Sequence, residues 1–147
     1  MKSYVVDASV IVAWLLPAAD EPLSMQAAMV EAAFSRNEIQ LAAPDLIYPE
    51  LGHVLRKAVS RGRISNQHAH EAADAIWTHN IPTFPARSLF ALALAISEDY
   101  GASMYDATYV ALGALTASPL ITGDERLIRK IDTAYPILWL GDFSLAQ

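Results

Sequence analysis

The stretch YVVDASV, residues 4–10, decides the fold, because it joins an apolar strand to a helix through one carboxylate. Three apolar residues precede Asp7, and the apolar pattern of the helix ASVIVAWLL follows it directly. A short apolar run without polar alternation is typical of a strand buried on both faces of a parallel sheet. The simplest role for Asp7 is to cap the helix by accepting hydrogen bonds from its free N–H groups.

The rest of the chain repeats this alternation of short apolar strands with amphipathic helices. Strands are predicted over residues 3–7, 39–43, 82–84, 120–122 and 137–140. Helices are predicted over about residues 9–16, 21–35, 46–61, 66–78, 87–99, 104–116 and 125–131. Strands joined by helical crossovers form a parallel sheet covered by helices on both faces. We therefore predict a three-layer α/β/α sandwich with a short-stranded, mostly parallel central sheet, built as one domain over residues 1–147.

The composition limits the chemistry and the setting. The chain has 147 residues, no cysteine, 54% hydrophobic residues and a formal charge of −6. It can therefore use neither a disulfide nor a thiolate, and its acidic total charge argues against a polyanionic partner. No apolar run approaches the roughly 18 residues of a membrane span, so we expect a soluble, cytoplasmic protein without a membrane partner.

Three aspartates stand at the starts of predicted helices. Asp7 and Asp124 each follow a strand, and Asp106 begins the helix that leads into residues 120–122. Each of the three alone can be explained as a helix cap or as an acid that interacts favourably with the helix dipole. In a parallel α/β fold, however, the carboxyl ends of the strands are where ligands bind.

Glu50 is harder to explain as a purely local feature. A rotation of about 100° per residue places it within roughly 40° of Leu46 and Val54, on the side that should face the protein. A buried carboxylate needs a cation or hydrogen-bond donors, although an acid near the first turn can also be a surface residue aided by the dipole.

Four acids that meet at one edge of the sheet would need a cation. Two carboxylates about 4 Å apart repel by about 4 kcal/mol at an effective dielectric constant of 20. Oxygen ligands alone select a hard divalent cation, Mg²⁺ or Mn²⁺. The sequence thus favours a metal site at the strand ends.

The blocks YVVDASV, PELGHVLRK, YDATYVAL and ITGDERL, in this order, resemble the PIN-domain ribonucleases, and especially the VapC-like toxins of bacterial type II toxin–antitoxin modules. The resemblance implies a PIN-like fold and a Mg²⁺- or Mn²⁺-dependent endoribonuclease. It implies four catalytic residues, Asp7, Glu50, Asp106 and Asp124, of which the three aspartates bind metal while Glu50 orients the attacking water or supports the metal ligands. The implied reaction is hydrolysis of a phosphodiester by water, with the 3′-oxygen as leaving group.

Other positions also match this family. Ser9 and Thr122 occupy places where the family often has a hydroxyl, whereas Ala13 stands where a lysine is frequent. The implied partners are an RNA substrate and a cognate antitoxin. The small apolar residues of LFALALAIS and YVALGALTA further suggest a homodimer interface.

Basic residues after Glu50 provide a candidate RNA contact. Lys57 and Arg61 are predicted on roughly the same helical side as Glu50, and they are either a phosphate-binding edge or an ordinary solvated helix face. The aromatic residues Trp14, Trp77, Tyr105 and Tyr109 are expected in the core or an interface rather than as stacking platforms for bases.

Two alternatives stay open. One is a phosphoryl-transfer domain with Asp7 as nucleophile, although Ser9 stands where such domains carry a second acid. The other is a non-catalytic PIN-like interaction module, which the presence of all four acids disfavours.

Overall fold

The centre of the molecule is a five-stranded sheet in the order β3-β2-β1-β4-β5, and every neighbouring pair is parallel. This computed structural model describes residues 1–145, apart from the side chain of Asp20, so the last two residues of the predicted domain lie outside it. The strands are β1 (Lys2–Val6), β2 (Ile39–Pro44), β3 (Thr83–Phe84), β4 (Leu120–Thr122) and β5 (Ile137–Trp139). The predicted parallel sheet is confirmed.

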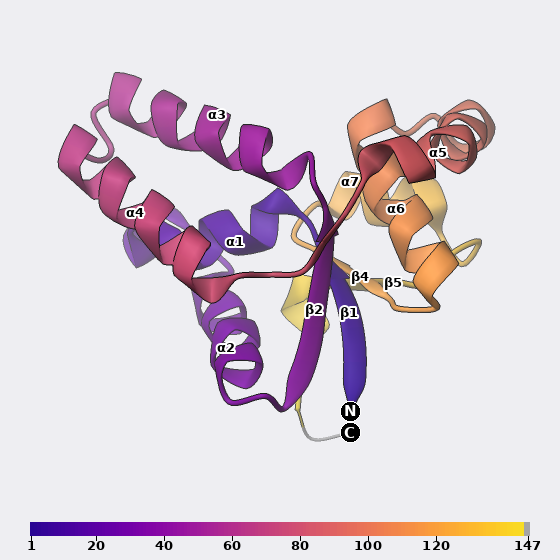
Figure 1. The fold of residues 1–147 in the computed structure, drawn as a ribbon, viewed down its shortest axis with the longest axis horizontal. Helices are drawn as coiled ribbons and strands as arrows, with labels where there is room; N and C mark the ends of the chain where they lie inside the picture. Colours follow the sequence, from indigo (N-terminus) through magenta and orange to yellow (C-terminus); the bar gives the residue numbers. More distant parts are fainter. Residues whose placement is uncertain (146–147) are drawn as a thin grey trace.

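Helices cover both faces of the sheet, as Figure 1 shows. The described helices are α1 (Ala8–Leu15), α2 (Ser24–Ser35), α3 (Ile47–Ser60), α4 (Asn66–His79), α5 (Ala86–Tyr100), α6 (Met104–Thr116) and α7 (Glu125–Ile131), with single 3₁₀ turns at Ala18–Asp20 and Leu140–Asp142. Helices α1 to α4 lie on one side of β1 and β2, and α5 and α6 lie on the other. The predicted three-layer sandwich is therefore confirmed.

The strands have unbroken apolar sequences because they lie in the core of the molecule. Val5 and Val6 of β1 and Leu120 and Ile121 of β4 are all fully buried, since helices pack on both of their faces. The middle of α6 is buried on nearly all sides between the sheet and α5, including residues 107–113. No helix among residues 1–145 combines the length and the apolar character needed to cross a bilayer.

Some predicted boundaries were wrong for identifiable reasons. The helix predicted from residue 21 begins only at Ser24, after the 3₁₀ turn and Pro22. Strand β3 has only two residues, both exposed, because it lies at the sheet edge between Pro82 and Pro85. Helix α3 ends at Ser60, which makes Arg61 its C-cap rather than a helical residue.

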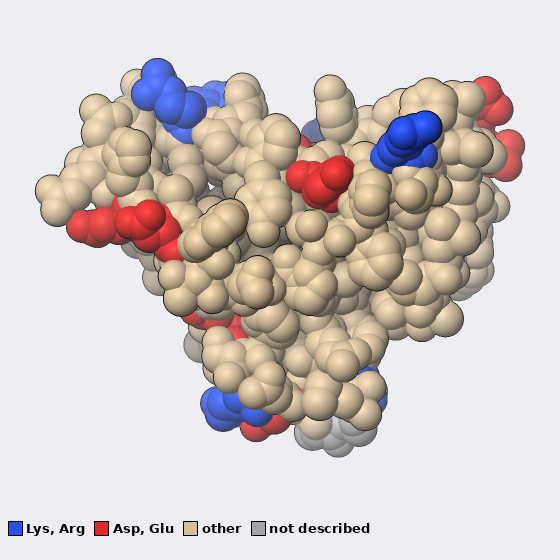
Figure 2. Space-filling model, viewed as in Figure 1, with Lys and Arg blue, Asp and Glu red and all other residues tan. Residues whose placement is uncertain are grey.

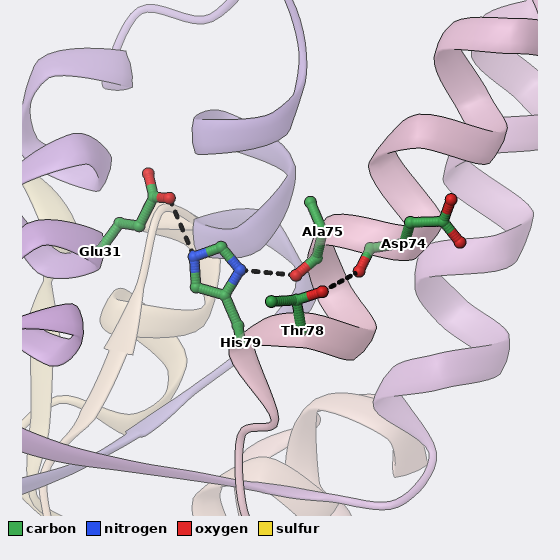
Figure 3. Close-up of polar contacts among 5 residues, drawn as sticks. All are labelled: Glu31, Asp74, Ala75, Thr78 and His79. Atoms are coloured by element: carbon green, nitrogen blue, oxygen red, sulfur yellow. Dashed lines mark hydrogen bonds and ion pairs between the residues drawn. The ribbon is translucent and has the colours of Figure 1, made fainter.

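Helix α4 is held to the body of the molecule by a histidine at its end (Figure 3). The two ring nitrogens of His79 lie 2.6 Å from the Ala75 carbonyl oxygen and 2.9 Å from the Glu31 carboxylate of α2. The imidazole also stacks on Trp14 of α1, with ring centroids 5.6 Å apart. One side chain thus connects three helices.

Candidate active site

The first and last of the predicted acids follow neighbouring strands and so lie at the same edge of the sheet. Strand β1 pairs with β4 through Val6 and Ile121, and Asp7 and Asp124 follow these strands at the same carboxyl edge. Each aspartate is also the N-cap of the next helix, as the sequence suggests. The strand order therefore places two carboxylates at the carboxyl edge of the sheet, and their hydrogen bonds to the first turns of α1 and α7 fix the backbone around them.

Asp7 is the most buried of the four acids, with 7% of its surface exposed. Its Oδ1 accepts hydrogen bonds from the Ser9 N–H at 3.0 Å and from the Ser9 hydroxyl. Burial raises the pKa of Asp7 to about 6, with Asp106 adding to the rise and the hydroxyls of Ser9 and Thr122 opposing it. The hydrogen bonds to Asp7 therefore offset only part of the cost of burying its charged form.

The two hydroxyl residues hold the strand ends together. The Ser9 hydroxyl accepts a hydrogen bond from the Gly123 N–H at 3.0 Å, which ties the β1 turn to the β4 turn. Thr122, fully buried, accepts from the Asp124 N–H at 3.0 Å. Both hydroxyls thus accept hydrogen bonds from the backbone of the turn that follows β4.

Glu50 enters from α3, on the first turn of that helix. Burial, and then the charges of Asp7 and Asp106, raise the pKa of Glu50 to about 7. Its Oε1 is buried and has no hydrogen-bond partner among the described residues. Of the two roles considered for Glu50, these features favour an acid that faces the protein over a surface acid aided by the helix dipole.

Asp106 enters from the opposite layer, on the first turn of α6. Its N–H donates to the Ser103 hydroxyl at 3.1 Å, which is the N-cap contact that the spacing predicts. Burial and then the charge of Asp124 raise the pKa of Asp106, while Ser103 and Lys130 oppose that rise. The charges of Asp106 and Asp124 thus repel each other directly.

Tyr109 is a site residue that the sequence analysis did not recognise. It is 1% exposed, as a core residue should be, but its hydroxyl has no hydrogen-bond partner among the described residues. Burial and then the charges of Glu50 and Asp7 raise the pKa of this phenol. One feature of the sequence could have identified it: Tyr109 follows Asp106 by three residues, which places both on one side of α6.

The four acids come from four different parts of the fold, and their charges interact: Asp7, Glu50 and Asp106 with one another, and Asp124 with Asp106. Within the described part of the chain, however, no three Asp, Glu or His side chains are arranged so that they could hold a metal ion as they stand. The oxygen donors and the unpaired Glu50 Oε1 nevertheless match the requirements of a hard divalent cation, which would offset their mutual repulsion.

A cleft opens beside the acids, between α3 and the start of α6. It has a volume of about 580 Å³ and is lined by Pro49, Glu50, His53, Val54, Ser103, Tyr105 and Asp106. Figure 2 shows acidic atoms on this face near the end of β2, between the two groups of helices. Lys57 and Arg61 are exposed further along α3 and do not line this cleft.

The fold and the site define an α/β protein whose parallel sheet carries a cluster of carboxylates at its carboxyl edge. Residues 4–133 match the PIN domain family, and the chain belongs to that family. Ribonuclease VapC1 of Mycobacterium tuberculosis is 38% identical over 88 residues, which are 58% of this chain and 63% of that relative. The match thus spans less than two thirds of the relative's length.

Two solved structures share the fold. The crystal structure of PAE2754 from Pyrobaculum aerophilum superposes with a TM-score of 0.67 at 22% identity, covering 95% of this chain and 85% of that one. VapBC2 from Rickettsia felis, bound to a DNA fragment from their promoter, gives a TM-score of 0.65 at 11% identity, covering 93% and 98%. These likenesses establish the architecture.

Proposed function

We propose that this PIN-domain protein is a divalent-metal-dependent endoribonuclease and the toxin of a toxin–antitoxin pair. The proposal is supported most by the interaction of the acids Asp7, Glu50, Asp106 and Asp124, because burial and mutual repulsion raise the pKa of the first three. The similarity to a protein named as a ribonuclease supports the choice of RNA as substrate.

In the proposed mechanism, Asp7, Asp106 and Asp124 hold Mg²⁺ or Mn²⁺. When bound, such an ion activates water and neutralises charge that develops on the phosphate. Ser9 and Thr122 keep Asp7 and the β4 turn in place through their hydrogen bonds. The chain needs no nucleophilic side chain, because the attacking group is water.

Glu50 is the proton acceptor in this proposal. Its buried Oε1, which has no hydrogen-bond partner among the described residues, is free to accept a proton from the attacking water. The Tyr109 hydroxyl lies close enough to the same carboxyl to lower its pKa in part, although the two make no hydrogen bond as they stand; a bond donated by this hydroxyl would orient Glu50. Tyr109 is therefore a positioning residue.

The test is cleavage of total RNA by the purified protein, with Mg²⁺ and with chelator. We expect cleavage only with the metal, products with 5′-phosphate ends, and loss of at least about 100-fold in activity for Asp106→Asn, since one removed charge-stabilising group costs that much in enzymes. Asp99→Asn, an exposed acid on α5, is the matched control. Equal cleavage by the Asp106→Asn and parent proteins would reject the assignment.

The partners follow from the same proposal. The antitoxin would be a small protein whose C-terminal segment occupies the acidic cleft, and its gene would lie next to this one. A homodimer stays a prediction, supported by the exposed Phe90 and Leu94 on α5. If Asp7 were a phosphoryl acceptor instead, the protein would form a stable beryllofluoride adduct, which the nuclease does not require.

A further inference from the structure

The cleft beside the acids has two chemically different parts. Glu50 and Asp106 contribute carboxylates, whereas Pro49, Val54 and Tyr105 contribute apolar surface to the same cavity. Its volume of about 580 Å³ lies within the range of roughly 300–1,000 Å³ that is usual for small-molecule sites. The acids account for only one part of this cleft, so the apolar wall needs an explanation of its own.

Tyr105 is the most conspicuous residue of that wall. It directly precedes Asp106 in the first turn of α6, and it leaves 67% of its surface exposed although its ring is large and mostly apolar. The Ser103 N-cap fixes the backbone of this turn, so Tyr105 and Asp106 keep a constant relation to each other. Of the two places predicted for Tyr105, the core or an interface, the core is wrong, because α5 and the sheet cover the other sides of α6 and leave this one open.

A nucleotide has parts that match both halves of the cleft. In the proposed reaction the phosphate lies at the carboxylates, and the attached base must then lie within one nucleotide of them. A base presents a flat apolar face that stacks on aromatic side chains, and such stacking contributes about 1–3 kcal/mol per base. In a duplex that face is covered by neighbouring bases, so only an unpaired strand can offer it.

We propose that Tyr105, with Pro49 and Val54, forms a subsite that stacks an unpaired nucleobase next to the scissile phosphate. This inference rests on the proposed function, because that function places the phosphate at the acids. Tyr105 contributes to substrate binding and strand selection, and it takes no part in the proton transfers.

The subsite is tested by RNA binding and cleavage in three variants. Tyr105→Ala removes the ring, Tyr105→Phe keeps it, and Trp77→Ala is the control, since Trp77 is 78% exposed on α4 and does not line the cleft. The probes are a single-stranded RNA 12-mer and the same sequence as a duplex. A second single-stranded series carries 2-aminopurine, a base whose fluorescence falls on stacking, at one position at a time.

For Tyr105→Ala we expect roughly 10-fold weaker binding of the single strand and a similar rise in KM with kcat little changed, since about 1.4 kcal/mol corresponds to a factor of ten. Tyr105→Phe and Trp77→Ala should behave like the parent protein. The 2-aminopurine signal should be quenched at one position by the parent and by Tyr105→Phe but not by Tyr105→Ala. The duplex should bind less tightly and show no dependence on Tyr105.

The outcomes separate the subsite from the nuclease assignment. If the parent cleaves RNA and Tyr105→Ala binds and cleaves equally well, the subsite is overturned and the function stands. If the parent stacks 2-aminopurine through Tyr105 without cleaving, the subsite stands and the nuclease assignment falls. If the parent binds no RNA, both are overturned.

Discussion

Asp7 has two effects on stability that act in opposite directions. As the N-cap of α1 it accepts hydrogen bonds from Ser9 and so stabilises the helix. As a buried carboxylate with a pKa raised to about 6, it destabilises the folded protein whenever it is ionised. A local reading of the sequence could find the first effect, but the second depends on acids that are distant along the chain.

Replacing Asp7 by asparagine should therefore stabilise the metal-free protein. Asparagine caps helices as well as aspartate does, and the change removes only the charge. A pKa rise from 3.8 to about 6 sets an upper limit of about 3 kcal/mol on the gain at pH 8. Thermal melting with chelator measures it. Asp7→Ala should gain about 1 kcal/mol less because it also loses the cap, and a lower melting temperature for Asp7→Asn would contradict the prediction.

The pH dependence of stability should follow from the same groups. Acids whose pKa is raised by folding hold protons in the native state that the unfolded chain has lost. The free energy of unfolding should therefore fall as the pH rises from about 4 to about 7, the pKa of Glu50 in the folded protein. Denaturation in chelator at several pH values tests this, and the double variant Asp7→Asn, Glu50→Gln should show a shallower slope. A slope equal to that of the parent would show that these acids are not the cause.

At the scale of single elements, helix α4 depends on one cluster of contacts. Both ring nitrogens of His79 lie within hydrogen-bond distance of an oxygen atom, one of the Ala75 carbonyl and one of the Glu31 carboxylate. His79→Phe keeps a ring against Trp14 but removes both contacts, and we expect it to lower stability by about 1 kcal/mol, because the ion pair is partly exposed. Hydrogen exchange in α4 should speed up most. Glu71→Gln, in an exposed pair with Gln67 on the same helix, should change little.

Two glycines in helices should respond oppositely to alanine. A Cβ at Gly113 of α6 would lie 2.8 Å from the Ser118 carbonyl oxygen, in the turn that leads into β4, so Gly113→Ala should cost about 1–3 kcal/mol. A Cβ at Gly52 of α3 would meet nothing within 4 Å, so Gly52→Ala should stabilise the protein by about 0.5–1 kcal/mol. Denaturant melts of both variants test the pair, and equal signs would refute the packing argument.

The elements also show how far the sequence could predict this fold. Apolar runs and helical periodicity located β1, β4 and α6, because their burial on both faces leaves a direct pattern. The surroundings of Tyr105 and Tyr109 could not be read in this way, since the packing of α6 against the sheet decides which side of the helix is open. Tertiary contacts, and not local spacing, set the exposure of Tyr105 and the unpaired hydroxyl of Tyr109.

At the scale of the whole molecule, the charge distribution matters more than the total. The formal charge is −6, yet one group of basic atoms gathers over the far part of α3 in Figure 2, and a second lies over the start of α5. Arg56, Lys57 and Arg61 are exposed at that end of α3, and Arg63 forms an ion pair with Glu21 at 3.1 Å. This distribution lets one end of the α3–α4 hairpin attract a polyanion while the acids remain available for a cation.

Lys57 and Arg61 provide the last prediction, because a rise of 1.5 Å per residue places them roughly 10–16 Å along α3 from Glu50. If an RNA strand follows this helix, the two cations contact phosphates beyond the cleft. The variant Lys57→Ala, Arg61→Ala should then weaken binding of a single-stranded RNA more at low salt than at high salt. It should also make the slope of log K against log salt shallower by about 1.4, at roughly 0.7 for each phosphate contact. Arg36→Ala is the matched control, because it removes a cation at the end of α2, where Arg36 pairs with Glu38. Slopes that do not differ between the double variant and the parent would assign Lys57 and Arg61 to an ordinary solvated helix face.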